Sequence, residues 1–289
     1  MRSIDAAVDL FELDATPFFP QDRYECGPAA LTTVLTASGA EVTLDEIIDK
    51  VYLPGRRGSL QAELLAATRT SGRLPYVIDP RLNAIWKELA AGRPVLVLQN
   101  LGIAAIPSWH YAVVIGIDPS GDQVILRSGT DRRRTTSIDL FLRTWRRGDY
   151  WAMVALRPDE LPAAPNRTRY FRSIAEMEQA GAMTEAGSAW DAALGKWPDD
   201  PVAMFGLANV RLASGEAAQA ERLYRDLLAA DPAQAVARNN LAMALAEQGH
   251  YDEALVEVDK ALTYNQDPRL AAELADTRVT ILNRRSNVE

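Results

Sequence analysis

The sequence is short of the residues that build disulfides, metal sites and membrane spans. Its 289 residues include one cysteine and two histidines, so an intrachain disulfide is excluded and no cluster of metal ligands is expected. No apolar run approaches the ~18 residues that a membrane-spanning helix needs. The stretch from Gly55 to Gly58 lacks the lysine and the spacing of a phosphate-binding loop. The sequence therefore predicts neither a cofactor nor a metal ion.

The N-terminus lacks the apolar core of a secretory signal peptide, because acidic residues interrupt residues 1–17. As it stands the sequence predicts a cytoplasmic protein, and export to the cell envelope is the alternative if a leader has been removed. The net charge is −8, with 18 basic and 20 acidic residues in residues 1–160 but 13 and 19 in residues 161–289. This acidic C-terminal part argues against nucleic acid or an anionic membrane as its partner.

Positive charge is concentrated at one place, where Arg132, Arg133 and Arg134 follow one another and Arg127 is nearby. The first interpretation of this run is a solvated loop. The alternative is a contact for an acidic segment of a substrate.

The only cysteine, Cys26, begins a segment that is rich in Ala, Leu and Thr. Pro28 in the first turn and Gly39 beyond the last turn predict a helix of about three turns. Cys26 would then stand at the helix N-terminus, where unpaired N–H groups and the helix dipole favour negative charge. We therefore expect its thiol to ionise more easily than a free thiol, whose pKa is about 8.5, as suits a nucleophile.

Gln21, followed after four residues by the run Cys26-Gly27-Pro28-Ala29-Ala30-Leu31, resembles the signature of bacteriocin-processing peptidases. These bacterial, papain-like hydrolases trim double-glycine leaders, and the resemblance extends over about residues 17–158. It implies that the Gln21 side chain and the Cys26 backbone N–H form an oxyanion hole, and that a peptide is cut after small residues such as Gly-Gly. Without this resemblance, Cys26 would be interpreted as a small buried hydrophobic residue.

A cysteine peptidase also needs a base that accepts the thiol proton. His110 starts a predicted strand and resembles the catalytic histidine of the family. His250 follows Gly249 at a turn of the C-terminal part, so it is expected to be structural. His110 is therefore the predicted base for Cys26.

The group that orients the histidine departs from the family, because Ser128 stands where an aspartate is usual. Asp118 is eight residues along the strand from His110, or roughly 26 Å, which is too far. If Asp118 pairs with Asp122 across the turn, Ser128 and Thr130 point to the same side as His110. Ser128 is the predicted orienting residue, and Thr130 and Asp131 are the alternatives.

Residues 1–160 place most of their predicted helices before most of their predicted strands. Thr43 opens a helix with a capping box, residues 60–71 form a second, and a third is capped by Asp79 and runs to Gly92. A helix over residues 137–145 accompanies the strands. The predicted strands cover residues 95–98, 111–117, 123–126 and 150–156. Helices followed by strands predict an α+β domain, the class of the papain-like peptidases.

Residues 158–166 form the predicted linker, and residues 161–289 repeat with a period of 34. Glycine recurs at 181, 215 and 249, alanine at 186, 220 and 254, and leucine at 194, 228 and 262. This period, with glycine at the inner turn and alanine where helices cross, is the tetratricopeptide pattern. We expect an all-α domain of about three repeats with a capping helix over residues 269–283.

Together these features predict a cysteine peptidase that acts on a peptide or protein substrate. The repeats would hold a protein partner or the body of the substrate in their concave groove. The alternative is a catalytically degenerate peptidase-like domain that binds a peptide and serves as a scaffold. Acyl transfer or amide hydrolysis on a non-peptide substrate would use the same residues.

Overall fold

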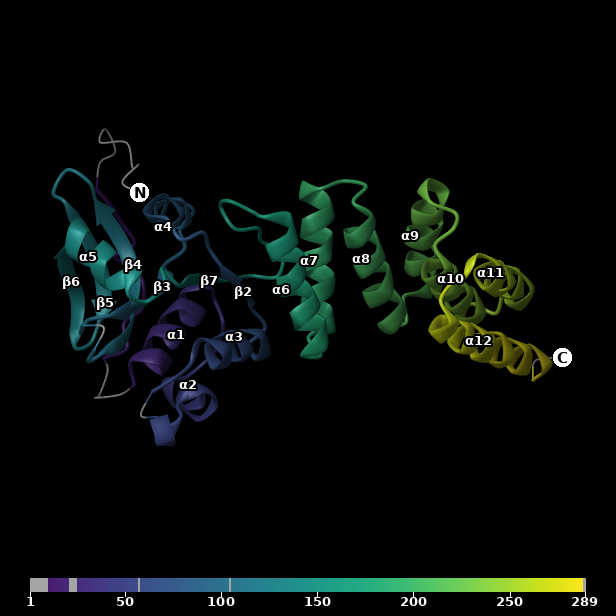
Figure 1. Ribbon diagram of the computed structural model, residues 1–289, viewed down its shortest axis with the longest axis horizontal. Helices are drawn as coiled ribbons and strands as arrows, with labels where there is room; N and C mark the ends of the chain where they lie inside the picture. The colour runs from purple at the N-terminus through teal and green to yellow at the C-terminus, as the bar shows by residue number, and fades with distance from the viewer. Residues whose placement is uncertain (1–9, 21–24, 57, 104, 288–289) are drawn as a thin grey trace. The chain divides into compact units, whose positions relative to one another are not determined.

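The computed structural model describes residues 10–20, 25–56, 58–103 and 105–287. The chain divides into two compact units, unit 1 (Met1–Ala182) and unit 2 (Met183–Glu289). Unit 1 mixes helices with an antiparallel sheet, and unit 2 is helical (Figure 1). The predicted α+β class followed by an all-α region is confirmed.

The sheet of unit 1 has the strand order β2-β7-β3-β4-β5-β6, and β1 pairs with β4. Every neighbouring pair is antiparallel. The strands are β1 (Phe11–Glu12), β2 (Leu74–Val77), β3 (Val95–Asn100), β4 (Trp109–Asp118), β5 (Gln123–Ser128), β6 (Asp131–Ser137) and β7 (Ala152–Leu156). β4 is thus an inner strand, and β6 lies at one edge.

The helices of unit 1 cover both faces of this sheet. They are α1 (Cys26–Ala37), α2 (Leu44–Val51), α3 (Gln61–Thr70), α4 (Leu82–Ala90), α5 (Ile138–Arg146) and α6 (Arg167–Gln179), with a 3₁₀ turn, η1 (Pro54–Arg56). On one face, α1, α2 and α3 share a core with Leu96, Leu98 and Tyr111. Gln99 points to the opposite face, because side chains alternate along a strand, and its amide donates to Thr144 of α5 over 2.6 Å.

Helix α1 is the buried helix that the sequence predicts. It begins at Cys26, and the residues from Gly27 to Leu35 are all buried. Gly39 has φ +80°, the left-handed conformation that ends helices and that glycine adopts without steric cost. The hydroxyls of Thr32 and Thr33 donate to carbonyls one turn earlier, both over 2.8 Å, which satisfies two polar groups inside the core.

Two local predictions for unit 1 are wrong. Asp79 does not cap α4, which begins only at Leu82 with Arg81 at the N-cap position and no side-chain cap; Asp79 instead pairs with Arg169 over 2.9 Å. The arginine run is not a loop, because it lies in β6, whose residues pair with β5. Strand β6 is polar and largely exposed. It therefore lacks the alternation of apolar and polar residues that predicts a strand from sequence.

Helix α6 belongs to unit 1, whereas the sequence places the domain boundary at residue 160. Its buried face includes Tyr170, Phe171 and Ile174. The ring of Tyr170 lies 6.4 Å from that of Tyr76 on β2, and the Tyr170 hydroxyl donates to the Glu160 carbonyl over 2.9 Å. The ring contact and this hydrogen bond hold the helix on unit 1.

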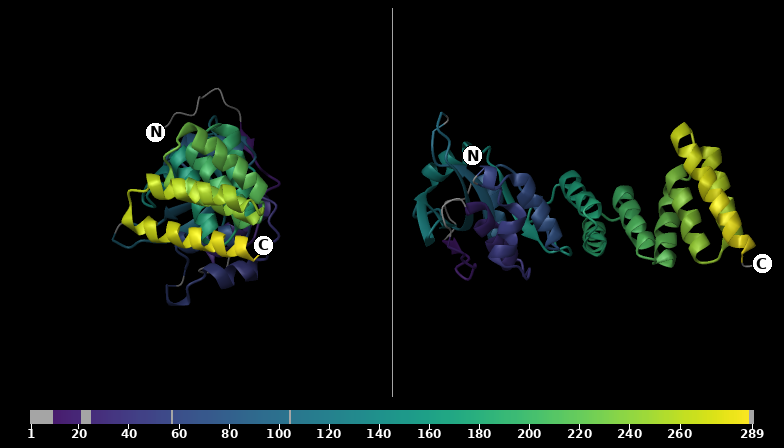
Figure 2. Two further views of the ribbon diagram at one scale, coloured as in Figure 1. Left: turned by 90° about the vertical axis from the view of Figure 1, so that its right-hand side faces the viewer. Right: turned by 90° about the horizontal axis from the view of Figure 1, so that it is seen from below.

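Unit 2 consists of helices that follow the 34-residue period. They are α7 (Met183–Lys196), α8 (Pro201–Ala213), α9 (Ala217–Ala230), α10 (Ala235–Glu247), α11 (Tyr251–Tyr264) and α12 (Pro268–Ser286). Gly215 and Gly249 end α8 and α10 with φ near +80°, and Ala220 and Ala254 are fully buried between helices. Helices α8 with α9 and α10 with α11 form antiparallel hairpins (Figures 1 and 2).

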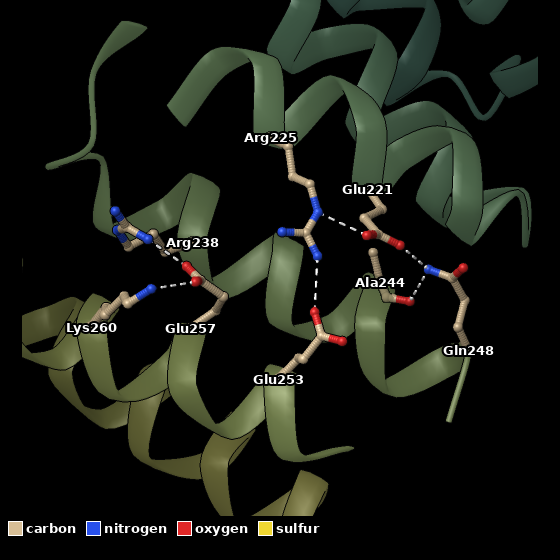
Figure 3. Close-up of polar contacts among 8 residues, drawn as sticks. All are labelled: Glu221, Arg225, Arg238, Ala244, Gln248, Glu253, Glu257 and Lys260. Atoms are coloured by element: carbon tan, nitrogen blue, oxygen red, sulfur yellow. Dashed lines mark hydrogen bonds and ion pairs between the residues drawn. The ribbon is translucent and has the colours of Figure 1, made fainter. Parts of the chain in front are cut away.

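Polar side chains link the helices of unit 2 both between hairpins and within one (Figure 3). Arg225 of α9 pairs with Glu221 over 2.8 Å on its own helix and with Glu253 of α11 over 3.1 Å. Arg238 of α10 pairs with Glu257 of α11, and both side chains are mostly buried. Removing one partner of the Arg238–Glu257 pair would therefore leave an uncompensated charge inside the unit.

Candidate active site

Cys26 is the first residue of α1, as predicted, and its side chain is half-buried at the helix N-terminus. The backbone groups of Tyr111 and Gly27 hydrogen-bond the thiol. Tyr111 is the third residue of β4 and directly follows His110. The fold therefore brings the cysteine against the strand that carries the predicted base.

The expected acidity of the thiol is wrong for the free protein. Burial raises the pKa of Cys26 above its ordinary value, and the hydrogen bonds from the backbone of Tyr111, Gly27 and Cys26 itself offset that shift only in part. Loss of water penalises the thiolate more than the helix N-terminus stabilises it. At neutral pH the thiol is consequently protonated.

His110 is the second residue of β4 and is half-buried beside β5. Its Nε2 lies 2.8 Å from the hydroxyl oxygen of Ser128. Burial lowers the pKa of His110 to about 4, and the positive charge of Arg134 on β6 adds to this shift. The imidazole is therefore neutral at neutral pH, and one of its nitrogens is free to accept a proton.

Ser128, the last residue of β5, is buried with 2% of its surface exposed. At the turn the strands pair Asp118 with Gln123, one residue away from the predicted pair. A bulge between Val114 and Gly116 takes up that residue, so that Val113 lies opposite Arg127. Beyond the bulge the register is the predicted one, and Ser128 points to the side of His110.

The alternative orienting residues are exposed. Thr130 lies in the turn that joins β5 to β6, and Asp131 begins β6 opposite Ser128. Asp118 accepts hydrogen bonds from Ser120 over 2.7 Å and from the Gly121 N–H over 2.8 Å within its own turn. His250 lies at the start of α11 in unit 2. Gln21, the predicted oxyanion residue, lies outside the described residues.

Two residues beside the site carry no sequence signal that identifies them. Tyr111 is buried, and its hydroxyl contacts the Ser59 carbonyl over 3.4 Å; burial and the charges of Cys26 and Glu63 raise its pKa. Arg134 was visible only as part of a basic run. Its proximity to His110 depends on how β6 pairs with β5, which the composition of the run does not reveal.

Neither a metal site nor a membrane span is found in the described part of the chain. No group of three or more His, Cys, Asp or Glu side chains among those residues could hold a metal ion. None of their helices is both long and apolar enough to cross a bilayer. What the described residues offer chemically is a thiol, an imidazole and a hydroxyl.

Comparison with protein families covers both parts of the chain. Residues 13–151 match the model of the Peptidase_C39 like family. Residues 211–276 match a tetratricopeptide repeat model. No curated protein matched the chain.

Solved structures of both kinds are similar to parts of the chain. A protein from Bacillus anthracis described as a C39-like peptidase is 16% identical, with 52% of this chain and 98% of that chain covered and a TM-score of 0.43. A double glycine motif protease from an AMS/PCAT transporter, in complex with the leader peptide, is 20% identical, with 48% and 89% covered and a TM-score of 0.36. The Yersinia enterocolitica type III secretion chaperone SycD, in complex with a peptide of the translocator YopD, is 17% identical, with 40% and 92% covered and a TM-score of 0.38.

The two family models divide the chain as its architecture does, with the first over the sheet and its helices and the second over helical hairpins of unit 2. Cys26, His110 and Ser128 all lie within residues 13–151. Residues 13–151 therefore form a domain similar to the C39-like peptidase family, and the C-terminal part of the chain is a helical tetratricopeptide repeat region.

Proposed function

We propose that the chain is a cysteine peptidase acting on a peptide or protein substrate. Cys26 attacks the scissile carbonyl, and His110 accepts the thiol proton and later donates it to the leaving amine. The observation that carries the proposal is the His110–Ser128 contact of 2.8 Å. Tyr111, the residue after His110 on β4, hydrogen-bonds the Cys26 thiol through its backbone. A half-buried nucleophile, a base and an orienting group thus occupy adjacent elements.

Ser128 orients His110 by selecting its tautomer. When Nε2 carries the proton and donates it to the Ser128 oxygen, Nδ1 keeps a lone pair that can accept the thiol proton. A hydroxyl does not compensate the positive charge of the imidazolium as a carboxylate would. The resting enzyme therefore holds a neutral thiol and a neutral imidazole, and the proton moves only as the thiol attacks.

The oxyanion of the tetrahedral intermediate needs donors beside the thiol. The backbone N–H of Cys26 is one candidate, because the first N–H groups of a helix have no partner within the helix. Family resemblance supplies Gln21 as the second donor. We assign both to this role.

An exposed apolar surface adjoins His110 on the connection between β3 and β4. Trp109 has 54% of its surface exposed, Ile103 63% and Ile106 73%. The connection is held in shape by Asn100, whose side-chain oxygen accepts the N–H groups of Gly102 and Ser108 over 3.0 and 2.9 Å. Exposed apolar side chains beside a catalytic group support a peptide rather than a small polar substrate.

A peptide-binding scaffold without catalysis is the second candidate. It is favoured by the two pKa shifts, since the raised pKa of Cys26 and the lowered pKa of His110 both oppose a thiolate–imidazolium pair. In either case the repeats of unit 2 recruit a protein partner or the body of the substrate, as their concave surfaces are suited to extended ligands.

The test is incubation of the full chain with a peptide library, with products identified by mass spectrometry. We expect cleaved peptides from the wild type and none from Cys26→Ala or His110→Ala. Cleavage that survives either substitution would contradict the assigned roles. Peptides that bind equally to the wild type and Cys26→Ala and are cut by neither would establish the scaffold instead.

A further inference from the structure

Two of the three consecutive arginines of β6, Arg133 and Arg134, have different surroundings. Arg133 makes a bidentate pair with Glu12 of β1, with both distances 2.9 Å. Arg134 lies opposite Leu126 of β5, and its side chain is exposed. Among the described residues, the side chain of Arg134 has no hydrogen-bond or ion-pair partner.

The pairing of the strands places Arg134 on the face of the sheet to which His110 and Ser128 point. Leu126 lies opposite Val114 on β4 and opposite Arg134 on β6, and residues directly opposite each other point to the same side. Side chains alternate along a strand, so Ser128 and His110 point to that side as well.

Arg134 interacts electrostatically with His110: after burial, its positive charge is the second cause of the low pKa of the imidazole. The site thus combines a neutral hydroxyl, where the family has a carboxylate, with an unpaired cation. A guanidinium binds carboxylates through two parallel hydrogen bonds. A carboxylate beside Arg134 would cancel the charge that disfavours the imidazolium.

We propose that Arg134 binds a carboxylate of the substrate, so that the substrate itself supplies the negative charge that Ser128 lacks. This inference rests on the proposed peptidase function and narrows its substrate class. The substrate is a peptide with an acidic side chain close to the scissile bond, or a peptide whose terminal carboxylate lies there. Peptides with neither bind less tightly and react more slowly.

The test is a titration of the histidines by NMR, which is simple because the chain has only two. Probes are added at constant ionic strength: N-acetylglutamic acid α-amide for a side-chain carboxylate, N-acetylglycine for a terminal one, and N-acetylglutamine amide as the neutral analogue. We expect one or both carboxylates to raise the pKa of His110 and the neutral amide to leave it unchanged. The probe that raises the pKa of His110 shows whether the site binds a side-chain carboxylate or a terminal one.

Arg134→Gln is the decisive variant and Arg133→Gln is its matched control on the same strand. In the free protein, Arg134→Gln should raise the pKa of His110, although it stays below the ordinary value of 6.5 because burial is the larger cause. The response to carboxylates should vanish in Arg134→Gln and persist in Arg133→Gln. Arg134→Lys keeps the positive charge but cannot form the two parallel hydrogen bonds of a guanidinium, so it should retain a weaker response.

An equal response to carboxylates in the wild type and Arg134→Gln, or no response in the wild type, would overturn the proposal. The measurement does not depend on turnover. A carboxylate response in a protein that cleaves no peptide would support the Arg134 site and contradict only the proposed peptidase function.

Discussion

The imidazole of His110 and the hydroxyl of Ser128 lie 2.8 Å apart on neighbouring strands. Ser128 is almost fully buried, so this hydrogen bond is shielded from competition with water. It holds the imidazole in one orientation and, with Nε2 as the donor, in one tautomer. It adds no negative charge to offset the burial and the charge of Arg134, which lower the pKa of His110.

Replacing Ser128 tests that role directly. Ser128→Ala removes a hydrogen bond whose net value is about 0.5–1.5 kcal/mol, so the rate of peptide cleavage should fall roughly two- to tenfold. Ser128→Asp should raise the pKa of His110, because a carboxylate within hydrogen-bond distance favours the imidazolium. Cleavage assays and NMR titration of the two histidines measure these effects.

Thr130→Ala and Asp131→Asn are the controls for Ser128, since both residues lie close to it in the β5–β6 hairpin but are exposed. We expect cleavage rates close to wild type for both. A loss of rate in either of them, with Ser128→Ala unaffected, would transfer the orienting role to that residue.

The raised pKa of Cys26 predicts slow alkylation at neutral pH. The rate of reaction with iodoacetamide should rise with pH and have its midpoint above that of the same thiol in the denatured protein, because burial disfavours the thiolate. His110→Ala should slow the reaction near pH 7, where the imidazole assists proton removal, and leave the rate at pH 10 almost unchanged. A midpoint below that of the denatured protein would contradict this environment for the thiol.

The lowered pKa of His110 predicts a loss of stability in acid. Between its ordinary value of 6.5 and its folded value of about 4, the unfolded chain binds a proton that the folded chain does not. Stability therefore falls as the pH drops through this window, by up to about 3 kcal/mol from this residue. Urea unfolding of wild type and His110→Gln from pH 7 to pH 4 should show a shallower dependence in the variant.

His250→Gln is the matched control for that measurement, because His250 lies in unit 2. The unfolding transition of unit 1 should keep the wild-type dependence on pH in this variant. Identical dependences for wild type and His110→Gln would show that the imidazole is not held neutral by the fold.

The Arg238–Glu257 pair predicts where unit 2 is sensitive to the loss of one charge. Only 10% and 12% of these side chains are exposed, and Arg238 also donates to the Pro232 carbonyl over 2.8 Å. Glu257→Gln should lower the free energy of unfolding of unit 2 by about 3–5 kcal/mol, since it leaves a buried charge uncompensated. Thermal and urea unfolding measure this change.

Asp252→Asn is the control on the same helix. Asp252 is 89% exposed and pairs with Arg285 over 2.8 Å, so its loss should cost about 0–1 kcal/mol. The double substitution Arg238→Met with Glu257→Leu should recover much of the stability, because no charge is left inside. Equal costs for Glu257→Gln and Asp252→Asn would show that the buried pair is as weak as a surface one.

The sequence alone determined the features that depend on local spacing. Pro28 and Gly39 bound the helix that starts at Cys26, because capping and helix termination are decided within a turn or two of the chain. The 34-residue period predicted the repeat helices in the same way, since each repeat contacts mainly its neighbours. Ser128 was found beside His110 by counting along a hairpin.

Only the tertiary structure decided what surrounds these residues. The predicted register holds at Ser128 because a bulge between Val114 and Gly116 corrects a one-residue difference at the turn, and bulges have no fixed sequence signal. Burial, which is set by elements distant in the chain, reversed the expected shift of the Cys26 pKa. The pairing of a polar edge strand placed Arg134 beside the site, because backbone hydrogen bonds between strands form without any apolar pattern in the sequence.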